Sequence, residues 1–202
     1  ATPAAARPEA GDSVADDAHL NTFTGHEGAV WNIAYAPDGE TLVSAGEDGT
    51  VRLWPTQIAT EPVTLHGDAV PAYAVDFSDD AEYLAAGFQD NKALVWNREG
   101  ELIYTFGDHG DSVYDVDFTP QGQNLLTASD GIRAWNLGDG GLVNSFGSEG
   151  VLMPTLDISP NGQYAATGDT YEGVRIFRVG EGSMAAHDLS YTDHAWSVAF
   201  AP

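Results

Sequence analysis

Several residue types are scarce or missing in this 202-residue sequence. Cysteine is absent, which excludes disulfides, thiol nucleophiles and thiolate zinc sites. Basic residues are few: seven Lys+Arg oppose 31 Asp+Glu, the formal net charge is -24, and Lys92 is the single lysine. A surface of this sign repels phosphate groups, so nucleic acid and anionic membrane surfaces are poor candidate partners.

Long apolar segments are also missing. No run approaches the roughly 18 to 20 apolar residues of a transmembrane helix, and the N-terminus has no apolar signal core, so we expect no membrane insertion. A hydrophobic content of 43% is enough for a substantial core. The acid-rich, lysine-poor composition resembles that of proteins from salty environments, where dense carboxylates keep a surface hydrated. We expect a soluble protein, either in the cytoplasm of a salt-adapted organism or outside the cytoplasm.

The first eighteen residues differ from the rest. Residues 1–18 combine Ala, Pro and acidic residues without apolar periodicity, which indicates a disordered tail or linker. The chain begins at Ala1 rather than Met, so we expect a processed product or a piece of a longer protein.

From residue 20 onward the sequence repeats at an interval of about forty residues. The aromatic anchors are Trp54, Trp96, Trp135 and Phe177. Each interval holds a run ending in an aromatic residue or Ile, a polar turn, a small-residue run, an acidic turn and the anchor run, as in AVWNIAYAPDG, ETLVSAG, EDG and TVRLW. Runs of four to seven residues between Pro, Gly and Asp turns predict antiparallel strands, and a fourth short strand follows each anchor.

This pattern resembles the WD40 family of β-propellers over residues 20–202. Gly25-His26, Pro37-Asp38-Gly39 and the stretch DGTVRLW match the family's repeat, although no Asp follows the aromatic anchor. The resemblance implies an all-β propeller of four-stranded antiparallel blades, incomplete within this chain. The expected blades cover about 25–66, 67–107, 108–147 and 148–189, with a partial fifth at 190–202.

Both ends of the repeat region point to an open arc. Residues 20–23 are expected to form the outer strand of a preceding blade, and residues 195–202 the inner strand of a fifth. WD40 propellers usually close with about seven blades. Missing repeats or a second chain would then complete the ring.

The resemblance also implies a structural role for the histidines. His26, Ser44, Asp48 and Trp54 would form a buried hydrogen-bond chain, and His66 and His109 would belong to partial copies of it. The alternatives are metal ligands or general bases, but these histidines fall in different blades.

Aspartates recur at one position of the expected innermost strands, Asp76, Asp117 and Asp157, where the first unit has Ala34. Two interpretations stay open. The carboxylates form a channel ring that holds a cation such as Ca²⁺, or each accepts hydrogen bonds from a neighbouring blade.

The resemblance further places a binding face at the channel entrance. Two sets of positions would line it. The first comprises Trp31, Tyr73, Tyr114, Pro154 and Trp196, and the second comprises Glu47, Gln89 and Ser129. Trp and Tyr often dominate interfaces, which favours a binding face. A core role is the alternative, but Ile33, Tyr35, Val75, Phe77, Val116 and Phe118 are expected to fill the core.

Together these patterns predict a non-catalytic scaffold that binds a peptide or partner subunit, with a basic partner favoured by charge. No cofactor or metal is expected. The competing hypotheses are a metal-dependent hydrolase that uses the channel carboxylates, and an architectural subunit of a larger assembly.

Overall fold

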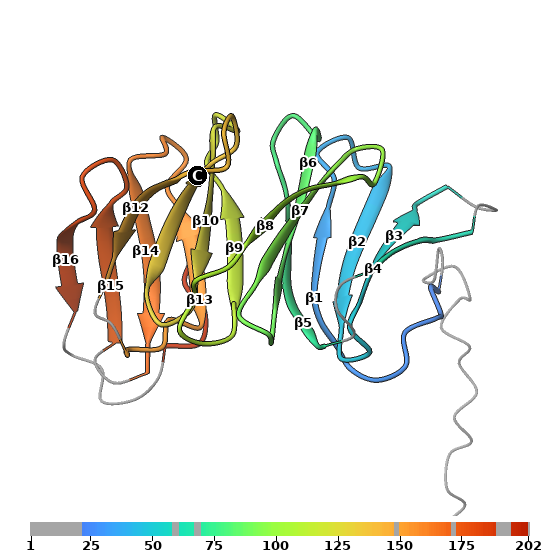
Figure 1. Ribbon diagram of the computed structural model, residues 1–202, viewed down its shortest axis with the longest axis horizontal. Helices are drawn as coiled ribbons and strands as arrows, with labels where there is room; N and C mark the ends of the chain where they lie inside the picture. The colour runs from blue at the N-terminus through green and yellow to red at the C-terminus, as the bar shows by residue number, and fades with distance from the viewer. Residues whose placement is uncertain are drawn as a thin grey trace, which may run out of the picture.

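A computed structural model describes residues 22–57, 61–66, 70–147, 150–170, 173–188 and 195–201. Within these ranges the regular elements are β-strands, arranged in four four-stranded sheets, each built from consecutive antiparallel strands (Figure 1). The all-β prediction and the four-stranded antiparallel pattern are therefore confirmed. No helix in this part of the chain is long and apolar enough to cross a membrane.

We call the four sheets blades and number them in chain order. The first two blades contain β1 (Val30–Tyr35), β2 (Thr41–Gly46), β3 (Thr50–Pro55), β4 (Val63–His66), β5 (Ala72–Phe77), β6 (Tyr83–Phe88), β7 (Ala93–Asn97) and β8 (Leu102–Phe106). The third and fourth contain β9 (Asp115–Phe118), β10 (Asn124–Ala128), β11 (Ile132–Asn136), β12 (Leu142–Phe146), β13 (Thr155–Ile158), β14 (Tyr164–Asp169), β15 (Gly173–Arg178) and β16 (Ser183–Asp188). The inner strands are β1, β5, β9 and β13, and the colour in Figure 1 runs steadily from blade to blade.

The turn after each inner strand needs one residue with positive φ. Gly39, Gly122 and Gly162 supply it in the first, third and fourth blades, with φ between 65° and 70°. The second blade has Ala81 at this place, with φ 57°. A Cβ atom is unfavourable in this region, so the second blade retains backbone strain that the other three avoid.

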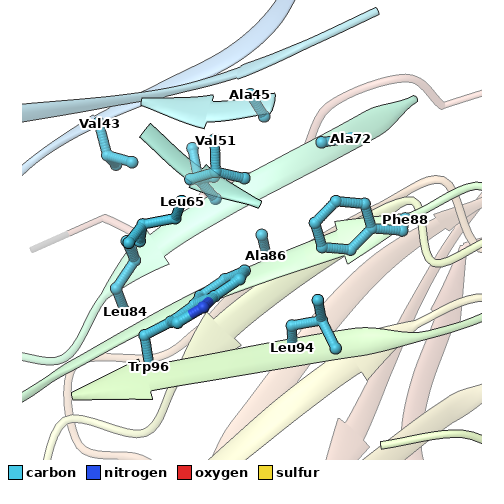
Figure 2. Packing of buried hydrophobic residues seen from close by; sticks show 11 residues of the cluster. Val43, Ala45, Val51, Leu65, Ala72, Leu84, Ala86, Phe88, Leu94 and Trp96 are labelled. Carbon is cyan, nitrogen blue, oxygen red and sulfur yellow. The ribbon is translucent and has the colours of Figure 1, made fainter. Parts of the chain in front are cut away.

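Three apolar clusters lie between consecutive blades. The cluster between the first two blades joins side chains such as Val43 and Val51 to Val75, Phe88 and Trp96 (Figure 2). Equivalent clusters join the second blade to the third and the third to the fourth. The core of this protein is thus a series of inter-blade layers, and each blade depends on its neighbours for burial.

The structure corrects the predicted core at two positions. Val75, Val116 and Phe118 are buried as expected, but Ile33 and Tyr35 on β1 are 60% and 64% exposed. They lie on the face of β1 that corresponds to the face on which Val75 and Val116 are buried in the second and third blades. They are exposed because no described segment packs on that face of the first blade.

The two predicted end strands also differ from expectation. Leu20 lies outside the described residues, and Phe23 belongs to no strand. Residues 195–201 are not assigned to a strand either. However, the Phe200 N–H donates to Asp157 Oδ2 of the fourth blade, just as inner strands of described blades do. No strand in the described part of the chain pairs with this segment.

The strained turn generates a prediction. Replacing Ala81 with Gly should stabilise the protein by about 0.5–1 kcal/mol, because relief of positive-φ strain exceeds the added entropy of the unfolded chain. Gly39→Ala is the matched control: its Cβ would meet no atom within 4 Å, so its expected loss of about 1 kcal/mol reports φ alone. Urea unfolding measures both, and a lower midpoint for Ala81→Gly would contradict the strain.

Candidate functional site

A hydrogen-bond chain crosses the first blade between four side chains. The Trp54 indole N–H donates to Ser44 Oγ at 2.8 Å, His26 Nε2 lies 2.6 Å from the same oxygen, and His26 Nδ1 lies 2.9 Å from Asp48 Oδ1. A carboxylate only accepts, so Nδ1 carries the proton and Nε2 of the neutral ring accepts from the Ser44 hydroxyl. The structure thus brings together all four residues of the predicted chain.

Asp48 anchors the outer end of this chain. Burial acts to raise its pKa, but hydrogen bonds from the Glu27 N–H, His26 and Thr50 outweigh burial and hold the pKa of Asp48 well below its usual value. The carboxylate therefore stays ionised and keeps the His26 tautomer that Ser44 requires.

The third blade builds the chain with a different end group. His109 Nε2 lies 2.8 Å from Thr127 Oγ1, which also accepts the Trp135 indole N–H at 3.1 Å. The Nδ1–H of His109 donates to the Asn91 carbonyl at 3.0 Å, so a backbone acceptor replaces the carboxylate. Burial lowers the pKa of His109 to about 4, and the ring is neutral at ordinary pH.

The other two blades lack parts of the chain. Ala86 offers no hydroxyl to Trp96 in the second blade, and Phe177 has no indole N–H in the fourth. The backbone of His66 lies in β4, but its side chain is outside the described part of the structure. These chains occupy separate blades and serve the packing of each blade.

The inner-strand aspartates, Asp76, Asp117 and Asp157, bind the backbone of the next unit. Asp76 Oδ2 accepts the Phe118 N–H at 3.0 Å, and Asp117 Oδ2 accepts the Ile158 N–H at 2.8 Å. Asp157 accepts from the Phe200 N–H in the same way. This geometry favours the second interpretation of the recurring aspartates, that they link neighbouring blades.

The described residues include no group of three or more His, Asp or Glu side chains placed to hold a metal ion. Each inner-strand aspartate instead directs an oxygen at a backbone N–H of the next unit. A Ca²⁺ ion takes about six to eight oxygen ligands. The hydrolase hypothesis therefore receives no support from this geometry.

A further carboxylate, Asp115, joins the same region. Its Oδ2 accepts the Leu156 N–H at 2.7 Å, and its Oδ1 accepts the Val116 N–H at 3.0 Å. Burial raises the pKa of Asp115 to about 7, although these two hydrogen bonds favour the ionised form. The charges of Asp76 and Asp157 add to the rise.

Burial also raises the pKa of Asp76 to about 6 and that of Asp117 to about 9. Repulsion from Asp76, Asp115 and Asp157 raises the pKa of Asp117 further. The inner strands therefore carry carboxyl groups that remain partly protonated at neutral pH.

One cavity of about 650 Å³ is lined by the five aromatic and proline residues of the first predicted set. We call these residues, Trp31, Tyr73, Tyr114, Pro154 and Trp196, the aromatic mouth. Tyr73 stacks on Tyr114 with ring centroids 5.7 Å apart, and Trp31 meets Tyr73 edge-on at 6.3 Å. Trp31 is 55% exposed and Trp196 is 70% exposed. Trp31, Tyr73 and Tyr114 form a row across three blades, and Trp196 lines the same cavity.

Local backbone irregularities determine the direction in which two of these rings point. The register of β1 against β2 shifts between Val30 and Asn32, and that of β5 against β6 shifts between Ala72 and Ala74. Trp31 and Tyr73 are the residues between the shifts. Because a bulge re-aims the extra side chain, both rings leave the normal alternation of the strand and line the cavity instead of the core.

The second predicted set lies elsewhere. Glu47 Oε2 accepts the Ala29 N–H at 3.1 Å, and the Gln89 carbonyl accepts from the Ser112 hydroxyl at 3.2 Å. Ser129 is fully buried. None of these three residues is among those that line the cavity.

Sequence reasoning missed Asp115, which also lines the cavity. The available signal was a carboxylate directly after a mouth residue. The corresponding residues after the other mouth positions are neutral: Asn32, Ala74, Thr155 and Ser197.

Comparison with protein families agrees with the repeat. The family model described as "WD domain, G-beta repeat" matches residues 18–55, 60–97 and 100–132. The chain belongs to the WD40 family.

Curated relatives are similar over part of their length. Nuclear distribution protein PAC1 of Arthroderma benhamiae is 28% identical over 147 residues, covering 60% of this chain and 32% of the relative. Nuclear distribution protein nudF of Aspergillus niger is 26% identical over 90% of this chain and 43% of the relative. Pre-mRNA-processing factor 17 of Homo sapiens is 30% identical over 57% of this chain and 21% of the relative. The WD40 chain thus spans less than half the length of each.

The polar chain of the first blade yields a prediction. Trp54→Phe should destabilise the protein by about 1–3 kcal/mol, because Ser44 loses its donor in a buried site. Trp96→Phe is the matched control: Ala86 presents no hydroxyl there, so the same ring reduction should have a smaller effect. Chemical unfolding measures the free energy of unfolding of both variants. An equal decrease in the two would show that the indole N–H of Trp54 contributes little to stability.

The buried carboxyls predict how stability depends on pH. Asp115 binds its proton more tightly in the folded state than in the unfolded state, so the stabilisation that it gives is full below its unfolded pKa of about 3.9 and is lost progressively as pH rises through its folded pKa of about 7. His109 acts oppositely, but only below its unfolded pKa of about 6.5. The melting temperature should therefore fall from about pH 6.5 to about pH 8.5.

Substitutions test the origin of this fall. Asp115→Asn and Asp117→Asn remove the titrating protons but retain an amide oxygen for the Leu156 and Ile158 N–H groups, so each should flatten the profile. Asp38→Asn, in the turn at the opposite end of β1, should leave it unchanged. A wild-type melting temperature that is constant or rises over this range contradicts the prediction.

Proposed function

We propose that this WD40 chain is a non-catalytic interaction scaffold that binds a peptide segment or partner subunit at the aromatic mouth. The single observation that carries the proposal is the row of rings around one open cavity, with both tryptophans more than half exposed. Large rigid rings supply contact area at low entropic cost, and exposed aromatic clusters tend to mark interaction sites.

The size of the cavity suits a bound side chain or short segment. Ligand sites commonly have volumes of about 300–1,000 Å³ with mostly apolar walls and a few polar groups. The mouth has this character, with Trp, Tyr and Pro beside Asn32, Thr155 and Ser197.

The relatives support the same class of function. Their names refer to nuclear distribution and to pre-mRNA processing, and neither name denotes an enzymatic reaction. The residues available for chemistry support it too, because His26, His109, Ser44 and Thr127 all take part in hydrogen bonds within blades. A protein partner is therefore favoured over a small-molecule substrate.

Peptide selection tests this function. Random dodecapeptides displayed on phage should yield sequences that bind the protein and compete with one another for the mouth. Trp31→Ala and Trp196→Ala should each weaken a selected peptide by about tenfold or more, as expected for an interface anchor. Calorimetry or polarisation on synthetic peptides provides the measurement.

Leu142→Ala is the matched control, since Leu142 is 53% exposed on β12 and does not line the cavity. It should leave affinity unchanged. Selected peptides that bind both tryptophan variants as well as the wild type would reject the mouth as the binding site.

A further inference from the structure

The aromatic mouth contains one acidic side chain. Among the described residues that line the cavity, Asp115 is the single carboxylate, and the others are aromatic, aliphatic or neutral polar residues. It follows Tyr114 in the sequence and lines the same cavity as the stacked pair of tyrosines. An occupant of the mouth thus meets aromatic surface and one carboxylate together.

The carboxylate of Asp115 retains capacity to bind. Each of its oxygens accepts one backbone N–H, from Val116 and Leu156, whereas an ionised carboxylate offers about four acceptor positions. These two bonds also fix its orientation, because one donor belongs to its own blade and the other to the next blade. The group is held in place while part of its acceptor capacity is unused.

Most of the basic side chains in the described part of the chain are paired with other carboxylates. Five of the described basic residues form ion pairs with carboxylates other than Asp115 and the inner-strand aspartates: Arg52 with Asp48, Lys92 with Asp90, Arg98 with Glu82, Arg133 with Asp130, and Arg175 with Asp169. No ion pair among the described residues involves Asp115 or the inner-strand aspartates. Their mutual repulsion is therefore relieved by protonation or by a cation from outside.

We propose that the mouth binds one lysine or arginine side chain of a partner protein, with its aliphatic stem against the aromatic rings and its charged end at Asp115. This inference rests on the proposed function and names its ligand. Trp and Tyr faces add attraction for a cation, and a charge-assisted hydrogen bond to a carboxylate is stronger than a neutral one. The net charge of -24 also favours approach of basic partners.

Blocked pentapeptides Gly-Gly-X-Gly-Gly test the inference, with X as lysine, arginine, norleucine or glutamate. Binding is followed at about pH 8, above the Asp115 pKa of about 7, through the indole N–H signals of Trp31 and Trp196. Norleucine has the stem of lysine without its charge. The lysine and arginine peptides should bind about tenfold or more tightly than the norleucine peptide, and the glutamate peptide most weakly.

Asp115→Asn separates this inference from the proposed function. It should bring the lysine and norleucine peptides within about twofold of each other while both still shift the tryptophan signals. Asp38→Asn removes one charge at the far end of β1 and should retain the lysine preference. Thermal melts of both variants confirm that each is folded.

Each outcome has a defined meaning. A lysine preference that persists in Asp115→Asn, or equal binding of lysine and norleucine by the wild type, overturns the cation site but leaves the aromatic mouth as a binding face. Tryptophan signals that respond to none of the peptides, including those selected from the phage library, overturn both proposals.

Discussion

Each blade of this protein has two faces that its own four strands cannot cover. Burial therefore comes from the adjacent blade, and full burial of one Val, Leu or Phe side chain stabilises by about 1.5–3 kcal/mol. Val75, Val116 and Phe118 obtain this burial against a preceding blade, whereas Ile33 and Tyr35 at equivalent positions do not. The first blade is thus stabilised through one face only, and the row of blades is held together by successive pairwise layers.

Polar links cross the same interfaces near the propeller axis. Asp76, Asp117 and Asp157 each bind a backbone N–H of the following unit, and each follows a mouth residue by three positions in the sequence. Because each of these hydrogen bonds forms only three residues from a mouth residue, it sets the separation of adjacent inner strands at the mouth. Burial raises the pKa values of Asp76 and Asp117, so part of the stabilisation that these two carboxyl groups give depends on bound protons. The geometry of the binding face and the pH dependence of stability therefore have one origin.

Much of the fold follows from local patterns in the sequence. The recurring turns and anchor residues were sufficient for the strands and the family, because turn chemistry and strand alternation are local properties. The hydrogen-bonded residues of the first blade were named from the resemblance of this unit to the WD40 repeat. The alternation of β1 correctly separates Ile33 and Tyr35 from Ala34. It does not show whether a neighbour covers them, which is a tertiary property.

The candidate site was predicted only in part, for a similar reason. The position of Tyr73 depends on a bulge that the sequence does not specify. The recurring aspartates were compatible with metal binding or with links between blades, because one residue type serves both and only the direction of its oxygens distinguishes them. Asp115 was missed because it follows a more conspicuous aromatic residue and recurs in no other unit.

The mouth combines a strongly restrained centre with less restrained sides. Tyr73 and Tyr114 stack on each other, and the aspartates three residues after them bind the following blade. Ala34 stands where the first blade would need such an aspartate, so Trp31 is positioned by its bulge and its edge contact with Tyr73. A rigid centre favours selection of one side chain, since little conformational entropy is lost on binding. The exposed tryptophan rings can adjust to different peptide residues beside the bound side chain. We therefore expect the centre of the mouth to select one side chain and its edges to accept varied neighbouring residues.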